Sequence, residues 1–151
     1  MLRYSVPSIL LAWIFIFAST AVAQTAEADL VIGNWLVQDK NAKVQIYKKG
    51  DRYFGKIVWL KEPNDEQGNP KVDKENPEEK QRSRPILGMV MLLDFEYDED
   101  LVWEDGDIYD PKNGKTYSCK MTLSEDGRSL DVRGYIGISL IGRTQTWTRT
   151  E

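Results

Sequence analysis

Residues 115–123 read Lys-Thr-Tyr-Ser-Cys-Lys-Met-Thr-Leu, and after a short polar break residues 130–135 read Leu-Asp-Val-Arg-Gly-Tyr. The first segment places its apolar side chains at every second position: Tyr117, Cys119, Met121 and Leu123. Side chains of a β-strand alternate between two faces, so this period of two predicts a strand with one buried face. The break contains Asp-Gly-Arg-Ser at 126–129, a composition typical of tight turns. The stretch therefore predicts two neighbouring strands joined by a turn.

The same alternation, with β-branched and aromatic residues, recurs from residue 32 to the end of the chain. It predicts strands over 32–38, 43–49, 52–60, 86–97, 115–123, 130–135 and 140–150. Asn113-Gly114 is a strong hairpin signal between two of them. Short strands with regular turns and no long helix indicate an all-β protein, a sandwich or a barrel, and we expect a small antiparallel up-and-down β-barrel.

The N-terminus has the pattern of an export signal. Arg3 is followed by an apolar run over 9–18 and by Ala-Val-Ala at 21–23, a small-x-small cleavage site. A transmembrane anchor is the alternative, but the run is shorter than the roughly 18–20 residues that a span needs. We therefore expect a cleaved signal peptide (1–23), a flexible mature N-terminus (24–31) and one barrel domain (32–151). The mature protein would be periplasmic or secreted and not membrane-anchored.

Composition excludes several classes of function. The 151 residues carry a net charge of −4, which argues against a nucleic-acid partner. The chain has no histidine, so it lacks histidine-based triads and histidine-ligated metal sites. Its one cysteine, Cys119, rules out an internal disulfide and fits a small buried hydrophobe. We expect no metal and no cofactor.

Two polar segments interrupt the strand pattern. Residues 94–110 contain nine acids and no base, which we interpret as a solvated acidic edge that resists strand pairing; Ca²⁺ binding and paired catalytic carboxylates are the alternatives. Residues 61–85 form a polar stretch with four prolines, which predicts a long loop that acts as a lid or binding loop, or else a disordered excursion. A short helix can begin within it, with Asn76 as the N-cap and Pro77 in the first helical position.

The last predicted strand carries the most informative polar face. Arg143, Gln145, Trp147 and Arg149 share one face, opposite a row of threonines. If that face points inward, it offers a guanidinium and an indole to a carboxylate or phosphate group inside the barrel. The alternative is that Arg143 stacks on a tryptophan such as Trp35 and closes one end of the barrel.

Several strings in this order resemble one family. They are Gly33-Asn-Trp35, Gly55-Lys-Ile-Val-Trp-Leu60, Asp73-x-x-Asn76-Pro77, Arg84-Pro-Ile-Leu-Gly88, Ile108-Tyr-Asp-Pro111, Val132-Arg-Gly-Tyr135 and Gly142-Arg-Thr-Gln-Thr-Trp147. Together they resemble the exported bacterial domain-of-unknown-function family 2147 over residues 32–149. The resemblance implies a lipocalin-like barrel and carries no established activity or catalytic residues. Asp73, Asn76 and Arg84 are polar residues at its motif positions.

The favoured function is a non-enzymatic binding module for a small apolar or anionic ligand inside the barrel. We expect the ligand-binding residues to be Trp35, Trp59, Tyr117, Arg133, Arg143 and Trp147. One alternative is a structural or interaction protein of the cell envelope whose barrel is filled by side chains. The other is a carboxylate-based hydrolase, with a loop site at Asp73, Asn76 and Arg84.

Overall fold

The computed structural model describes residues 24–138 and 140–151, so the predicted signal peptide lies outside the described residues. The chain divides into two units, residues 1–30 and 31–151. Residues 24–28 are helical and a 3₁₀ turn, η1 (Asp29–Val31), follows them. No helix within the described ranges is long and apolar enough to cross a membrane.

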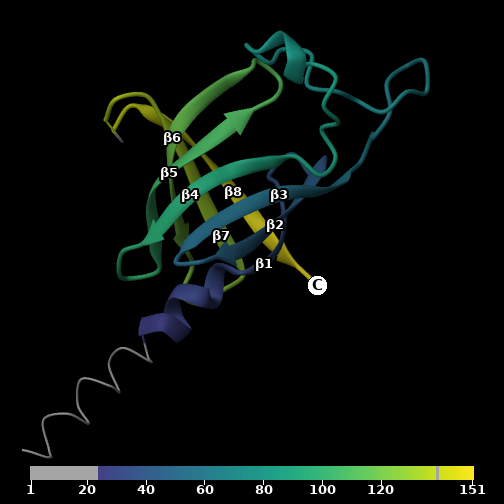
Figure 1. The fold of residues 1–151 in the computed structure, drawn as a ribbon. Helices are drawn as coiled ribbons and strands as arrows, with labels where there is room; N and C mark the ends of the chain where they lie inside the picture. The colour runs from purple at the N-terminus through teal and green to yellow at the C-terminus, as the bar shows by residue number, and fades with distance from the viewer. Residues whose placement is uncertain (1–23, 139) are drawn as a thin grey trace, which may run out of the picture. The chain divides into compact units, whose positions relative to one another are not determined.

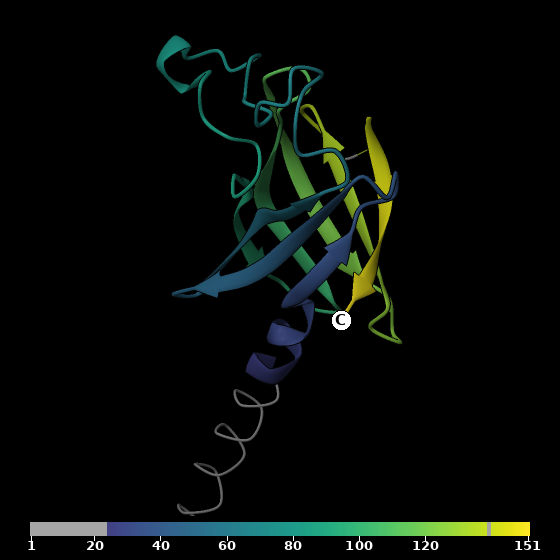
Figure 2. The ribbon, with the colours of Figure 1, turned by 90° about the vertical axis from the view of Figure 1, so that its right-hand side faces the viewer.

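Eight antiparallel strands form a closed barrel in simple chain order (Figure 1). They are β1 (Gly33–Leu36), β2 (Ala42–Lys49), β3 (Arg52–Leu60), β4 (Val90–Tyr97), β5 (Val102–Asp110), β6 (Lys115–Leu123), β7 (Ser129–Tyr135) and β8 (Gly142–Thr150). The pairing of β1 with β8, seen side by side in Figure 2, completes the cylinder. The structure confirms the predicted up-and-down β-barrel.

The barrel has two different ends. Short turns over 50–51, 98–101 and 124–128 connect the strands at one end, which we call the short-turn end. The other end, called the long-loop end, carries the connections 37–41, 61–89, 111–114 and 136–141. Figure 2 shows the connection 61–89 extending from the top of the barrel, whereas the C-terminus lies below. This connection holds a second 3₁₀ turn, η2 (Glu79–Gln81), so the predicted long loop with a short helix is confirmed.

The acidic segment corrects one prediction. The sequence predicted no strand between 97 and 115, but β5 runs through the acidic residues and pairs with both β4 and β6. The interpretation of an unpaired acidic edge is therefore wrong. A bulge disguises the strand: Asp105 has φ 57°, the register shifts between Trp103 and Gly106, and both of those residues are buried. The bulge breaks the period of two, while Asp107 stays exposed on the outer face.

Large side chains fill the barrel toward its short-turn end. Fully buried aromatic residues come from five strands: Trp35, Tyr53, Phe95, Trp103 and Trp147. Gly106 makes room for one of them, because a Cβ at this position would lie 2.4 Å from the ring of Phe95. Cys119 is also buried, as predicted. The core thus resembles a closely packed protein interior along this part of the barrel.

Arg149 closes the short-turn end. Its guanidinium lies 4.3 Å from the ring centroid of Trp35 and donates hydrogen bonds to the carbonyl oxygens of Gly127 (2.7 Å) and Ile32 (3.0 Å). One alternative from the sequence was that Arg143 stacks on a tryptophan such as Trp35. Arg149 occupies that place because β8 runs toward the short-turn end and pairs there with β1.

Candidate functional site

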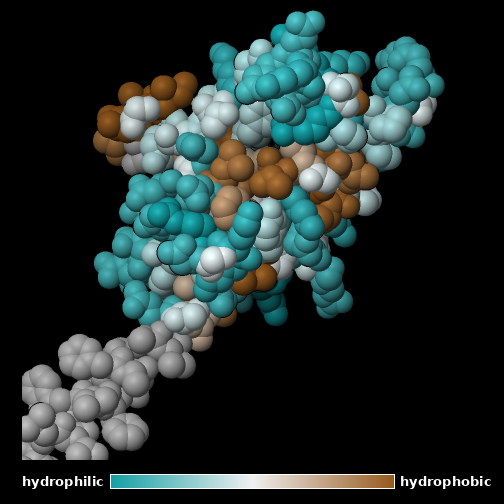
Figure 3. Space-filling model, viewed as in Figure 1, coloured by the Kyte–Doolittle hydropathy of each residue, from teal (hydrophilic) through white to brown (hydrophobic). Residues whose placement is uncertain are grey.

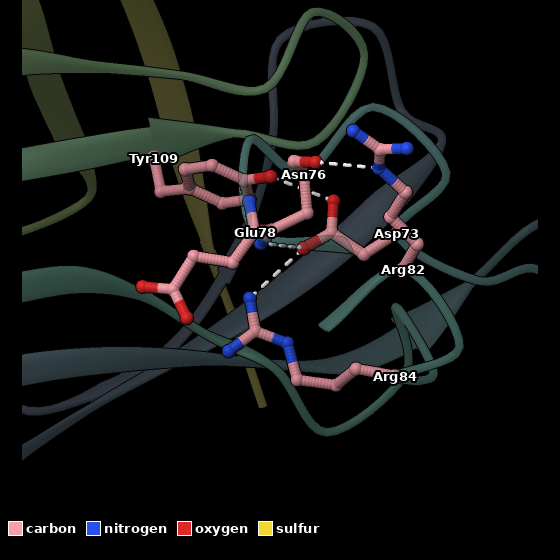
Figure 4. Close-up of polar contacts among 6 residues, drawn as sticks. All are labelled: Asp73, Asn76, Glu78, Arg82, Arg84 and Tyr109. Atoms are coloured by element: carbon pink, nitrogen blue, oxygen red, sulfur yellow. Dashed lines mark hydrogen bonds and ion pairs between the residues drawn. The ribbon is translucent and has the colours of Figure 1, made fainter. Parts of the chain in front are cut away.

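Asp73 forms the centre of a polar cluster in the connection 61–89 (Figure 4). Its Oδ2 accepts hydrogen bonds from Asn76 Nδ2 (2.7 Å) and from Arg84 Nη2 (2.9 Å), and its Oδ1 accepts one from the Tyr109 hydroxyl (2.7 Å). The side chain of Asp73 is fully buried, whereas that of Arg84 is 41% exposed. We call these four residues the Asp73 clasp, because they tie the connection to strand β5.

The backbone of the connection brings the clasp together. Asp73 N donates to the carbonyl oxygen of Arg84 (2.9 Å), so the segment returns on itself beside the carboxylate. The sequence predicted Asn76 as a helix N-cap, and this prediction is wrong. The Oδ1 of Asn76 accepts a hydrogen bond from Glu78 N (2.9 Å), and η2 starts three residues after Asn76. Pro77 therefore precedes the helical turn, and Arg82 Nε donates to the carbonyl oxygen of Asn76 (2.9 Å).

The connection also rests on the turn between β5 and β6. A Cβ at Gly114 would lie 1.9 Å from the carbonyl oxygen of Glu75, and Gly114 has φ +69°. Both the close approach and the left-handed backbone require glycine. Asn113 in the same turn donates from Nδ2 to the hydroxyl of Tyr117 (3.0 Å). The clasp thus fixes the connection over the β5–β6 turn.

Electrostatics in the clasp favour one protonation state. Burial by itself would raise the pKa of Asp73, but the hydrogen bonds from Asn76, Tyr109 and Arg84, together with the Arg84 charge, outweigh burial and hold this pKa below its ordinary value. Burial, followed by the bond to the Asp73 carboxylate, raises the pKa of Tyr109 to about 12. At neutral pH the pair is therefore a carboxylate and a neutral phenol.

The inner face of the barrel changes in character toward the long-loop end. Along β8, Trp147 is buried, Gln145 is half-buried and Arg143 is exposed, although alternation puts all three on one face. Trp147 Nε1 donates to Gln145 Oε1 (3.2 Å), which orients the amide. On β7, Gly134 pairs with Arg143. A Cβ placed on Gly134 would lie 3.7 Å from the Cβ of Tyr117 on β6. This rim offers one cation and two polar side chains to solvent.

The six predicted ligand-binding residues do not share one site. Trp35 and Trp147 belong to the buried core, and Tyr117 and Arg143 belong to the rim. Trp59 is 40% exposed and has the Lys43 ammonium 5.7 Å from its ring centroid. Arg133 lies on the outer face, where its Nη1 donates to Thr144 Oγ1 (2.9 Å). The structure therefore brings two of the six together at a solvent-exposed part of the inner face.

The three predicted loop residues do meet, in the clasp. Their fourth partner is Tyr109, which lies 36 residues after Asp73 and is not among the site residues that the sequence predicted. Its position in the Ile-Tyr-Asp-Pro string at 108–111 was the available signal. Within 24–138 and 140–151, no group of three or more Cys, Asp or Glu residues is placed to hold a metal ion.

The closed eight-stranded up-and-down barrel defines a lipocalin-like β-barrel protein. A family model described as an uncharacterized protein conserved in bacteria (DUF2147) matches residues 33–149, and the chain belongs to this family. No curated protein matches the sequence.

A solved structure has the same fold. Protein HP1028 from the human pathogen Helicobacter pylori, described as a member of the lipocalin family, aligns with a TM-score of 0.70. The alignment covers 80% of this chain and 83% of that chain at 24% sequence identity. The similarity supports the lipocalin-like architecture of the barrel and assigns no ligand.

Proposed function

We propose that this chain is an exported binding protein that takes a small ligand with an acidic group at the long-loop end of its barrel. The proposal rests on the increase in side-chain exposure along β8, from buried Trp147 through half-buried Gln145 to exposed Arg143. Ligands of small β-barrels enter at a mouth of this kind. In this arrangement the Arg143 guanidinium binds a carboxylate or phosphate group.

The remaining polar groups of the rim support the same ligand chemistry. Gln145 and Tyr117 provide neutral hydrogen-bonding groups near the cation. The apolar part of the ligand would lie against Ile108, which is half-buried and lies within 3.4 Å of a Cβ placed on Gly134. An amphipathic acid fits these groups better than a wholly apolar ligand does, because its acidic group can pair with the Arg143 guanidinium.

The test uses protein produced from the full chain, decanoate as the probe and decanol as its uncharged counterpart. Tryptophan fluorescence titration measures binding, and native mass spectrometry identifies any molecule that co-purifies. We expect decanoate to bind more tightly than decanol, and Arg143→Gln to weaken decanoate binding roughly tenfold or more, as for the loss of a charged hydrogen bond. Arg128→Gln, in the turn 124–128 at the short-turn end, is the matched control and should leave binding unchanged.

The opposite result has a definite meaning. If neither probe binds and the purified protein carries no small molecule, the proposal fails. The buried aromatic residues of the core would then support the alternative, a barrel filled by its own side chains that acts through its surface.

A further inference from the structure

The connection between β7 and β8 exposes four large aliphatic side chains. Ile136 is 72% exposed, Ile138 59%, Leu140 85% and Ile141 70%. Figure 3 shows strongly hydrophobic residues where this connection projects from the barrel. Exposed apolar side chains that gather in one place mark an interaction site, whereas scattered ones need no explanation. We call these four side chains, Ile136, Ile138, Leu140 and Ile141, the apolar tip.

Cationic side chains border the apolar tip. Arg133 precedes it on β7 and Arg143 follows it on β8, and the sequence has no acidic residue between Asp131 and Glu151. Arg133 Nη2 donates to the carbonyl oxygen of Leu140 (3.2 Å), so its charge is fixed at the base of the tip. The whole chain carries a net charge of −4, which makes this segment a local exception.

We propose that the apolar tip is a membrane-binding element that inserts into the surface of an anionic phospholipid bilayer. Aliphatic side chains at the end of a projecting loop can enter the boundary between headgroups and acyl chains. Arginines directly behind them contact anionic headgroups, which attract basic segments close to the bilayer. Binding of this kind is peripheral and reversible, and it does not depend on whether the barrel holds a ligand.

A bilayer suits the tip better than a second copy of the chain. A stable protein interface buries about 800 Å² on each partner and uses about 20–30 residues a side. Four aliphatic side chains are too few for such an interface, but they are enough for shallow insertion. Each aliphatic side chain that leaves water completely raises a partition coefficient by about a factor of ten or more. The arginine border also matches the charge of anionic lipids and gives no advantage to self-association, since like charges would meet.

Insertion of the tip would bring the long-loop end to the bilayer. The tip lies in the connection between β7 and β8 at this end, and Arg143 is the second residue of β8. The exposed end of the inner face would then lie close to the lipid surface. An acidic amphipathic ligand could pass between the two without crossing much water.

Vesicle co-sedimentation tests the proposal. The full chain is mixed with vesicles of phosphatidylcholine alone and with vesicles that also contain phosphatidylglycerol. We expect the protein to bind the anionic vesicles more tightly than the phosphatidylcholine vesicles, by about fivefold for each arginine that reaches the surface. Added salt should weaken this binding. The double variant Ile138→Asp/Leu140→Asp should lower binding by at least about a hundredfold.

Matched controls separate the tip from general surface effects. Leu87→Asp changes another exposed aliphatic side chain (48%), in the connection 61–89, and should leave binding within about twofold of the unchanged protein. Arg133→Gln should weaken binding to anionic vesicles, whereas Arg128→Gln at the short-turn end should not. Urea unfolding of each variant verifies that the barrel is intact.

Two results with vesicles would overturn the proposal: a wild-type protein that does not bind anionic vesicles, and a double variant that binds them as well as the wild type does. If the wild type does not bind vesicles and sedimentation equilibrium shows a dimer that the double variant abolishes, the tip is assigned to a second copy of the chain.

Discussion

The substitution Tyr109→Phe tests whether the Asp73 clasp stabilises the barrel. The change removes one hydroxyl and leaves Asp73 Oδ1 buried without the donor that now lies 2.7 Å away. A hydrogen bond to a charged group contributes about 1.5–3 kcal/mol, and an unsatisfied buried charged acceptor lies at the upper end of that range. We therefore expect the free energy of unfolding to fall by about 2–3 kcal/mol. For a barrel of this size the midpoint of thermal unfolding would fall by about 8–12 °C.

Urea unfolding followed by far-ultraviolet circular dichroism measures this loss, and Tyr117→Phe is the matched control. The Tyr117 hydroxyl accepts its hydrogen bond from an exposed side chain, Asn113, so its removal should cost less than about 0.5 kcal/mol. A double-mutant cycle with Asp73→Asn should give a coupling energy of at least about 1 kcal/mol, as expected for two groups in direct contact.

The pH dependence supplies a second readout. The pKa of Asp73 is lowered in the folded protein, so its contribution to stability is present above the ordinary value of 3.8 and is lost as the pH falls below it. The difference in free energy of unfolding between the wild type and Tyr109→Phe should therefore have its full value at pH 7 and decrease below pH 3.8. If the two proteins unfold within 0.5 kcal/mol of each other at pH 7, the carboxylate does not depend on this bond and the reasoning fails.

Three further substitutions or reactions test other parts of the structure. Arg149→Ala should lower the free energy of unfolding by about 3 kcal/mol in urea, because it removes the cation from the Trp35 ring and two charged hydrogen bonds; an unchanged midpoint would contradict this account. Gly106→Ala should cost at least about 2 kcal/mol by the same assay, because its Cβ would overlap the ring of Phe95; a neutral effect would show that the core can expand there. Burial, and then the charge of Asp107, raise the pKa of Cys119 to about 12, so Ellman's reagent at pH 8 should react with the thiol only after unfolding, and rapid reaction of the folded protein would disprove its burial.

The sequence predicts strands well where the inner face keeps a strict period of two. The predicted bounds 115–123 coincide with β6, which keeps that period. The bounds 52–60 also coincide with β3, although its pairing with β2 shifts register between Lys43 and Val44. The prediction fails for β5, where the bulge at Asp105 shifts the inner face by one residue and the outer face is acidic. Pairing with two neighbours stabilises this strand, and neither neighbour can be read from the segment itself.

The sequence likewise predicted only part of the candidate site. Local pattern placed Arg143 and Trp147 on one face of a strand, and the structure keeps them there. The direction of a face relative to the barrel interior depends on register, so the sequence could not separate Arg133 on the outside from Arg143 at the rim. The clasp required contacts between residues far apart in the chain, which periodicity does not encode.

The chemistry of the clasp limits what it can do. Both oxygens of Asp73 already accept hydrogen bonds, and the lowered pKa keeps this carboxylate ionised at neutral pH, so it is a poor general base. Tyr109, with a pKa of about 12, keeps its proton. Groups held in this way fix a backbone, and the backbone they fix is the connection 61–89 over the β5–β6 turn, next to the hydroxyl of Tyr117. The clasp therefore has a structural role: it holds the connection 61–89 against β5 and over the β5–β6 turn, and breaking it would release this loop without removing any side chain of the rim.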